Sequence, residues 1–199
     1  ISMGELKMDH LELRIEPAQE EHLRQYLNLI IRINGQSLID LVRPVELPFC
    51  TIEGHPNTAG NHWWVHPFEC EIFTDPYEVE SHFLGCTCGE ADCWPIMGRI
   101  ERTPSTVRWH SFYNPFRLAK YLSDVPRDDG RIFVPWDYAA LGPFVFDRKQ
   151  YEEAIAIVQP IYDAQRAEQK ARREEEVVAW NVYVDKLNAE HGLDADEDT

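Results

Sequence analysis

Hydrophobic and polar positions along the chain predict two β-hairpins, and the first lies at residues 26–49. Two β-prone runs flank the dipeptide Asn34-Gly35, and in the first of them one face is more apolar than the other. The dipeptide tolerates the positive φ angles of a type I′ turn. Pro44 and Pro48 in the second run are expected to end the pairing or to leave an edge strand. The earlier run Leu11–Ile15 predicts a further strand.

The second predicted hairpin spans residues 96–114, with Pro104-Ser105 at its turn. Side chains alternate between the two faces of a strand, and this divides the second run of the hairpin into two sets. One face would carry Val107, Trp109, Ser111 and Tyr113, and the other would carry Arg108, His110 and Phe112. The aromatic, proline-rich segment between the hairpins is expected to form sheet edge and loop.

Beyond Asp147 the apolar residues recur at helical spacing, and a helix is predicted over residues 147–191. Asp147 and Gln150 resemble a capping box, in which the carboxylate accepts from amides of the first turn while Gln150 reaches back. Pro160 lacks an amide hydrogen and is expected to kink the helix. The last turns carry an apolar stripe that consists of Val177, Trp180, Val184 and Leu187. Because the middle of the helix is highly charged, these last turns are expected to dock on a partner.

The elements together predict an α+β fold: a mostly antiparallel sheet with hairpins, followed by a long, kinked C-terminal helix. At 199 residues the chain is long enough to bury a sizeable core, and a single domain over residues 1–191 is expected. Residues 192–199 are expected to form a disordered acidic tail. Residues 1–8 are expected to be a remnant of processing or cloning.

The charge balance narrows the classes of partner. The chain has 35 acidic and 19 basic residues, for a formal net charge of −16. Nucleic-acid backbones are bound by clustered Lys and Arg, so no nucleic-acid partner is expected, whereas a basic protein suits this surface. No apolar run approaches the roughly 20 residues that span a bilayer, so no membrane partner is expected.

The cysteines carry the strongest chemical signal. Five cysteines, an odd number, favour a reducing compartment over a disulfide framework, and the cytoplasm is the expected location. Cys86, Cys88 and Cys93 lie within eight residues, and with His82 they read H-x3-C-x-C-x4-C. Tetrahedral zinc takes four N or S ligands at Zn–S distances of about 2.3 Å, and Gly89 gives the backbone freedom to wrap around the metal. The sequence therefore predicts a zinc site at Cys86, Cys88, Cys93 and His82.

The fourth ligand and the role of this turn stay open. The candidates that could replace His82 are His66, His110, Cys70 and a water. A water would leave the metal open for catalysis, with Glu90 or Asp92 as a base. A closed structural site is favoured, because pinning the loop to the second hairpin is enough to explain it. Without a metal, the three cysteines would be reduced thiols in a loop or a redox pair.

Two further groups of polar residues are expected to be structural. His62, His66 and Cys70 are spaced four residues apart, but the proline and tryptophans among them argue for extended chain, in which they are too far apart for one metal. An aromatic core with surface histidines is therefore predicted there. His110 could act as a general base and Arg117 could clamp a carboxylate or phosphate, but surface or satisfied polar roles are favoured for both.

Three motifs in chain order, CTCGEADCWP, VRWHSF and GPFVFDRKQY, resemble those of a set of uncharacterised bacterial proteins. That set shares a C-x-C-G-x3-C-x-P turn, a V-x-W strand and a GPF-x-F-x-R-x-x-Y start of a helix. The resemblance covers about Gly85–Tyr151 and does not include His82. It implies that the cysteine turn is a specific feature of these proteins, and it implies no activity.

The functional hypothesis from sequence is an acidic cytoplasmic protein-binding module, stabilised by a structural zinc turn. An immunity or antitoxin protein that binds a basic partner is one such module. The partner would be another protein or a second copy of the chain, bound through the C-terminal helix. The alternatives are a small zinc-dependent hydrolase that uses the same cysteine turn and a thiol redox sensor.

Overall fold

The structure is a computed structural model, and it describes residues 8–17, 27–65, 67, 70–74, 77–87, 94–119 and 133–191. Contacts within the chain divide it into two compact units, residues 1–159 and residues 160–199. The described residues form two antiparallel sheets with hairpins and a long C-terminal helix, so the α+β prediction is confirmed.

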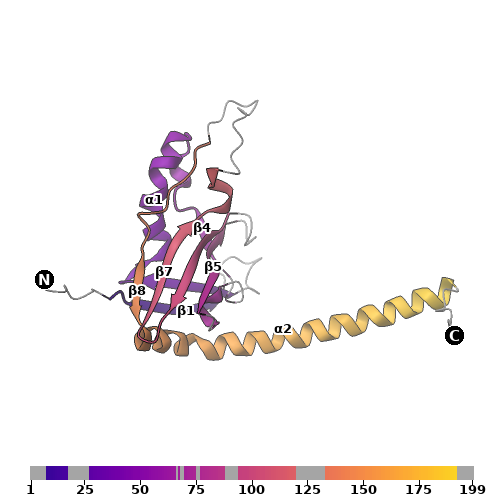
Figure 1. Cartoon of the computed structure of the whole chain (residues 1–199). Helices are drawn as coiled ribbons and strands as arrows, with labels where there is room; N and C mark the ends of the chain where they lie inside the picture. Colours follow the sequence, from indigo (N-terminus) through magenta and orange to yellow (C-terminus); the bar gives the residue numbers. More distant parts are fainter. Residues whose placement is uncertain are drawn as a thin grey trace, which may run out of the picture. The chain divides into compact units, whose positions relative to one another are not determined.

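The larger sheet forms the body of the first unit (Figure 1). Its strands, in spatial order, are β4 (His62–Trp64), β5 (Glu78–Cys86), β6 (Ile96–Arg102), β7 (Thr106–Tyr113) and β8 (Phe144–Asp147). All neighbouring strands in it are antiparallel. The predicted second hairpin is the β6–β7 pair. The segment between the hairpins was expected to form sheet edge and loop; β4 does lie at one edge, but β5 from the same segment is an interior strand, so the prediction is wrong there.

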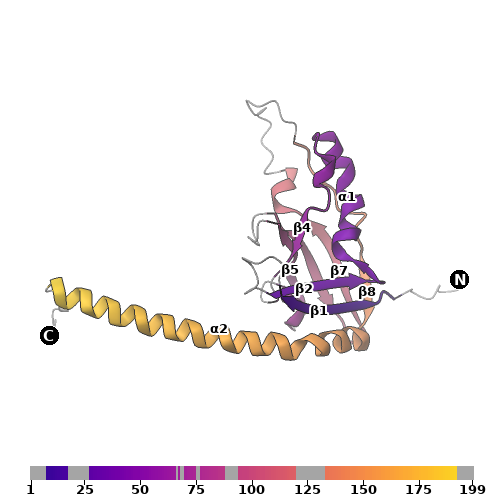
Figure 2. The ribbon, with the colours of Figure 1, turned by 180° about the vertical axis from the view of Figure 1, so that it is seen from behind.

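The smaller sheet consists of β1 (Leu11–Pro17), β2 (Leu27–Ile33) and the two-residue β3 (Gln36–Ser37). The turn between β2 and β3 has φ angles of 53° at Asn34 and 78° at Gly35, which confirms the predicted turn. Figure 2 shows this sheet and the helix α1 (Leu38–Ile52) on the same face of the larger sheet. One hydrophobic core joins the three elements.

The second arm of the first hairpin was wrongly predicted, because after Ser37 the chain turns into α1. The hydroxyl of Ser37 accepts from the amide of Asp40 at 3.1 Å and caps the helix. The buried residues of α1 are spaced four apart: Leu38, Val42, Glu46 and Cys50. Pro44 and Pro48 lie on the exposed side, where water can satisfy the carbonyls that their missing amides leave without a partner.

The alternation predicted for β7 is wrong at its end. Val107 and Trp109 are buried as expected, but Phe112 is buried and Ser111 is exposed. The β6–β7 register shifts between Met97 and Arg99, and Ser111 has a φ of 52°. A bulge places one extra residue in the strand, so every side chain beyond it changes face.

The helix α2 (Arg148–His191) begins where it was predicted and continues through Pro160. Asp147 accepts from the amide of Gln150 at 3.0 Å, which confirms the cap. The side chain of Gln150 does not reach back; it pairs with the backbone of Leu11 through two hydrogen bonds of 2.7 and 3.2 Å. The expected tail at residues 192–199 lies outside the described residues.

Within the second unit, α2 runs as a solvated helix. Every side chain from Ala171 to Tyr183 is exposed. No helix in the described ranges has the length and apolar character to cross a membrane.

Candidate functional site

A buried carboxylate on α1, Glu46, organises the most polar part of the core. Its side chain accepts from the amide of Gly60 at 2.8 Å, from Nε2 of His62 at 2.7 Å and from the hydroxyl of Tyr138 at 2.7 Å. Glu46, His62 and Tyr138 are each at most 4% exposed. We refer to Glu46, Gly60, His62 and Tyr138 as the Glu46 cluster. Burial, and then the charge of Glu46, raise the pKa of Tyr138, so the phenol keeps its proton and donates.

His62 is the member of the Glu46 cluster with unused bonding capacity. Its Nε2 contacts a carboxylate, which only accepts, so Nε2 donates this hydrogen bond and Nδ1 is the ring nitrogen that remains. This Nδ1 atom is buried and, within the described part of the chain, has no hydrogen-bond partner. The prediction of a surface histidine at this position is therefore wrong, because the turn before β4 directs the ring toward α1.

The register of the sheet places His62 directly opposite Cys86. Residues opposite each other in an antiparallel pair point to the same face, with Cβ atoms about 4.5–5.5 Å apart. Cys86 is the last residue of β5 and is half-buried. The first cysteine of the predicted zinc turn thus lies beside a buried imidazole.

The other residues predicted to bind zinc are placed as follows. His82 is in β5, four residues before Cys86 and on the same strand. Cys88 and Cys93 lie outside the described residues, as do Gly89, Glu90, Asp92 and His66. Within the described ranges no three His, Cys, Asp or Glu side chains form a group that could hold a metal. The zinc site therefore stays a prediction.

A second buried carboxylate on α1's C-terminal side, Glu53, holds Arg117. The two side chains form an ion pair at 2.8 Å, and Glu53 also accepts from the amide of Val134 and the indole of Trp136 at 3.0 and 3.1 Å. The guanidinium of Arg117 stacks over the rings of Trp94, Phe133 and Trp136 at 4.6–4.8 Å. Arg117 does clamp a carboxylate, as the sequence allowed, but the carboxylate belongs to the protein itself.

The buried cysteines are poor nucleophiles. Burial raises the pKa of Cys50, which lies on the same face of α1 as Glu46. Burial also raises the pKa of Cys70 to about 11. Thiolates, and not thiols, attack and bind metals, so neither side chain is activated for chemistry.

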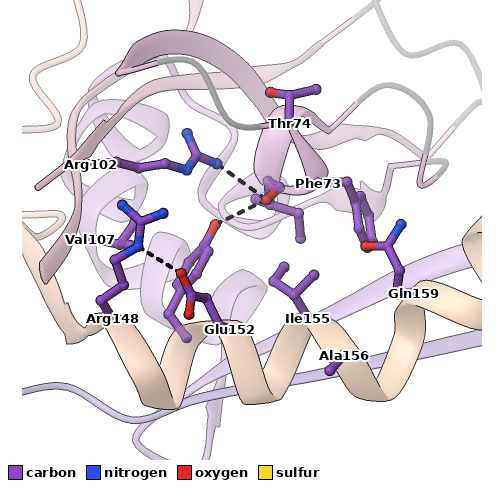
Figure 3. A pocket seen from close by; sticks show the side chains of 11 residues that line it. Phe73, Thr74, Arg102, Val107, Arg148, Glu152, Ile155, Ala156 and Gln159 are labelled. Atoms are coloured by element: carbon purple, nitrogen blue, oxygen red, sulfur yellow. Dashed lines mark hydrogen bonds and ion pairs between the residues drawn. The ribbon is translucent and has the colours of Figure 1, made fainter. Parts of the chain in front are cut away.

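A cavity of about 340 Å³ lies between the start of α2 and the segment around the 3₁₀ turn Glu71–Phe73 (Figure 3). Its polar groups already have partners. Arg102 donates to the carbonyl of Ile72 at 3.2 Å, and Tyr151 donates to the same carbonyl at 3.4 Å. Arg148 donates to Glu152 at 2.7 Å. The residues that line the cavity do not include His110, the possible general base, or Arg117, the possible clamp for a carboxylate or phosphate.

The distal part of α2 carries an exposed apolar surface. Five large side chains there are between 52% and 64% exposed: Val177, Val178, Trp180, Val182 and Tyr183. The rings of Trp180 and Tyr183 contact each other, with centroids 5.8 Å apart. Val184 and Leu187, the other members of the predicted stripe, are half-buried. We call the five exposed side chains the distal apolar patch.

Sequence reasoning did not find the Glu46 cluster. One local signal was available: Ser37, followed by Asp40 and an apolar run, is a helix-start pattern. That pattern would have placed Glu46 on the same face as Leu38 and Val42 at i, i+4 spacing. The pairing of Glu46 with His62 depends on tertiary packing and has no such signal.

The chain was compared with protein-family models, with curated protein sequences and with solved structures, and none of the three comparisons found a match.

Proposed function

We propose that this chain is an acidic protein-binding module of the cytoplasm that binds a basic protein through the distal apolar patch. The cysteine turn after β5 holds a structural zinc in this proposal. The observation that carries the proposal is the patch itself: five large apolar side chains more than half exposed on one helix. Apolar clusters of this kind, bordered by charged residues, are typical of protein interaction sites.

The two aromatic residues of the patch suit it to binding. Trp and Tyr are enriched among the residues that dominate binding energy, because they bury a large area at a small entropic cost. Trp180 and Tyr183 lie one turn apart on the same side of α2, and their rings are in contact. A helix that presents such anchors commonly binds in an apolar groove of its partner.

Charge favours a basic partner over a second copy of the chain. Three consecutive acids, Glu174 to Glu176, directly precede the patch. Two copies of a chain with a net charge of −16 would repel each other, whereas a basic groove would be attracted and would associate faster. A basic toxin, bound by this chain as its immunity or antitoxin protein, is one partner of this type.

A photo-crosslinking residue in place of Tyr183, introduced in the native host, tests this proposal. The expected product is a covalent adduct with a basic protein, identified by mass spectrometry. The matched control places the same residue at Tyr77, which is 69% exposed and lies in the first unit, and should not give that adduct. With the purified partner, Trp180→Ala is expected to weaken binding at least tenfold, while Tyr77→Ala leaves it unchanged.

Two results would overturn the proposal. An adduct only between two copies of the chain would make the patch a self-association surface. Equal labelling from Tyr183 and Tyr77 would show that the patch has no specific partner.

The described residues support the hydrolase and the redox sensor less than they support the protein-binding module. A hydrolase needs an open pocket beside the metal, and the described cavity lies among Arg102, Arg148 and the start of α2, none of which belongs to the cysteine turn. A redox sensor needs accessible thiolates, and because burial raises the pKa of Cys50 and Cys70, such a role would fall on the cysteine turn alone. Metal content and mild oxidation of the purified chain separate the redox sensor from the structural zinc.

A further inference from the structure

We propose that the cavity at the start of α2 binds a small carboxylic acid with an apolar body, and that Arg148 holds the carboxylate of this ligand. The described residues that line the cavity lie between positions 72 and 159, in the first unit, and they belong neither to the cysteine turn nor to the distal apolar patch. The volume of about 340 Å³ is within the range of small-molecule sites. The inference therefore goes beyond the proposed protein-binding surface.

The first support is the separation of charged and apolar groups within the cavity. The guanidinium groups of Arg102 and Arg148 lie at one end, and Phe73 and the uncharged Gln159 lie toward the other (Figure 3). The side chains of Phe73 and Ile155 pack against the core but are only half-buried. A cavity with a charged end and apolar walls suits a ligand with one charged group and an apolar body.

The second support is the sign of the charge. The lining carries two guanidinium groups and one carboxylate, so its net charge is +1, within a chain whose formal net charge is −16. Arg102 is 5% exposed and donates to the carbonyls of Glu71 and Ile72 at 3.3 and 3.2 Å. Carbonyls are neutral, so these two bonds hold the guanidinium in place without cancelling its charge. The cavity therefore favours an anion over a cation.

The third support is the pair of Arg148 and Glu152. The Nε atom of Arg148 donates to the carboxylate of Glu152 at 2.7 Å, which shows that a carboxylate fits at this end of the cavity. The side chain of Glu152 is 60% exposed, and exposed pairs of this kind contribute little to stability. A ligand carboxylate can therefore take the place of Glu152 on Arg148 while Glu152 turns toward the solvent.

The walls of the cavity are formed before any ligand arrives. Ile72, Val107 and Tyr151 are 1–3% exposed and belong to the hydrophobic core. The hydroxyl of Tyr151 donates to the carbonyl of Ile72 at 3.4 Å, which ties the start of α2 to the 3₁₀ turn. Because these groups are already fixed, a ligand does not have to order them, and its apolar body gains the free energy of leaving water.

NMR titration of the ¹⁵N-labelled full-length chain with octanoate tests this inference. Octanoate is expected to shift the amide signals of Thr74, Glu152 and Ile155, and the shifts should saturate at millimolar concentrations. Acetate, which has the carboxylate without the apolar body, and octanamide, which has the apolar body without the charge, should each bind at least about tenfold more weakly. A lack of saturation by octanoate, saturable shifts only at other residues, or equal binding of octanamide would each overturn the inference.

Two substitutions of the charged end are expected to act in opposite directions. Glu152→Gln removes the carboxylate that competes with the ligand, so it should tighten octanoate binding about two- to fivefold. Arg148→Gln should weaken the binding at least about tenfold. The matched control is Lys149→Gln, at a neighbouring side chain that is 86% exposed and outside the lining, and it should bind octanoate as the wild type does. Circular dichroism checks that each variant is folded.

A third substitution tests the place of the apolar body. Ala156 lines the cavity from an exposed position of α2, and leucine is a good helix former, so Ala156→Leu should fill the space and abolish octanoate binding while the chain stays folded. Wild-type affinity in the folded Arg148→Gln or Ala156→Leu chain would overturn the inference. Unchanged or weaker binding by Glu152→Gln would also overturn it, because a merely structural ion pair gives no gain in affinity when it is removed.

Discussion

At the scale of single residues, the buried carboxylate of Glu46 joins three segments of the core. A carboxylate that is 1% exposed is tolerated only where hydrogen bonds replace its lost water. Three donors from three different segments do so: the amide of Gly60, the ring of His62 and the hydroxyl of Tyr138. The cluster therefore fixes α1 against β4 and against the segment that carries Tyr138.

Replacing Glu46 by alanine removes the shared acceptor of these three donors. Glu46→Ala is expected to lower the free energy of unfolding by about 3–5 kcal/mol, because it leaves buried polar groups without a partner. Chemical denaturation of the purified chain measures this change. The matched control is Glu78→Ala, which removes an exposed pair with Arg99 and should change the same quantity by less than about 1 kcal/mol. Equal effects of the two substitutions would contradict the role of the Glu46 cluster.

The buried thiol and phenols predict a loss of stability at high pH. Burial raises the pKa of Cys70 from 9.0 to about 11 and also raises the pKa of Tyr151 and Tyr138. Between pH 9 and pH 11 the unfolded chain has lost the proton of Cys70 while the folded chain keeps it. The stabilisation is therefore complete below pH 9 and is lost as the pH rises toward 11.

Ionisation of Cys70 is expected to lower the free energy of unfolding by about 2–3 kcal/mol. Denaturation at several pH values between 8 and 11 measures it, and the Cys70→Ala chain should show a shallower decline over that range. A stability that stays constant up to pH 11 would contradict the burial of these groups.

At the scale of elements, the sequence was informative wherever the signal was local. Asn34-Gly35 specified its turn through φ angles that few other residues tolerate. Asp147 specified the start of α2 because one carboxylate can satisfy the first amides of a helix. Both signals involve residues within a few positions of each other, so no tertiary contact is needed to interpret them.

The errors at this scale came from competition between local patterns and packing. Residues 38–52 contain β-prone side chains and two prolines, yet the cap at Ser37 and the spacing of Val42, Glu46 and Cys50 make them a helix. The bulge at Ser111 depends on how β7 pairs with β6, which alternation within one strand cannot reveal.

The candidate site was predictable only in part for the same reason. The cysteine spacing points to the turn after β5, but the partner of Cys86 across the sheet is set by the β4–β5 register. His62 is 24 residues before Cys86 in the chain. The prediction of His82 as the fourth ligand followed from its short distance in sequence to Cys86, and it stays a prediction.

At the scale of the whole molecule, the two units differ in what stabilises them. The first unit has a hydrophobic core that includes both sheets and α1. In the second unit, the helix from Ala171 to Tyr183 is exposed on all sides, so its stability comes from helix propensity and from surface pairs such as Arg172 with Glu168 at 3.1 Å. Each such pair contributes about 0.2–0.5 kcal/mol, and a helix supported in this way is marginally stable in water.

Limited digestion with trypsin is therefore expected to cut the second unit first. The susceptible bonds follow Arg166, Lys170, Arg172 and Arg173, which are solvated in a helix that opens locally at low cost. Arg102 and Arg117, which are 5% and 7% exposed, should resist cleavage until the first unit unfolds. The expected product is a stable fragment that ends between residues 166 and 173, identified by mass spectrometry.

The partner proposed for the distal apolar patch makes this digestion diagnostic. Binding on Trp180 and Tyr183 stabilises the helix against local opening, because a ligand that binds only the folded form shifts the equilibrium toward it. The purified partner should therefore slow cleavage after Arg172 and Arg173, and it should not do so in the Trp180→Ala chain. Cleavage that begins after Arg102 or Arg117, or that proceeds at the same rate in both chains with the partner present, would contradict this account of the second unit.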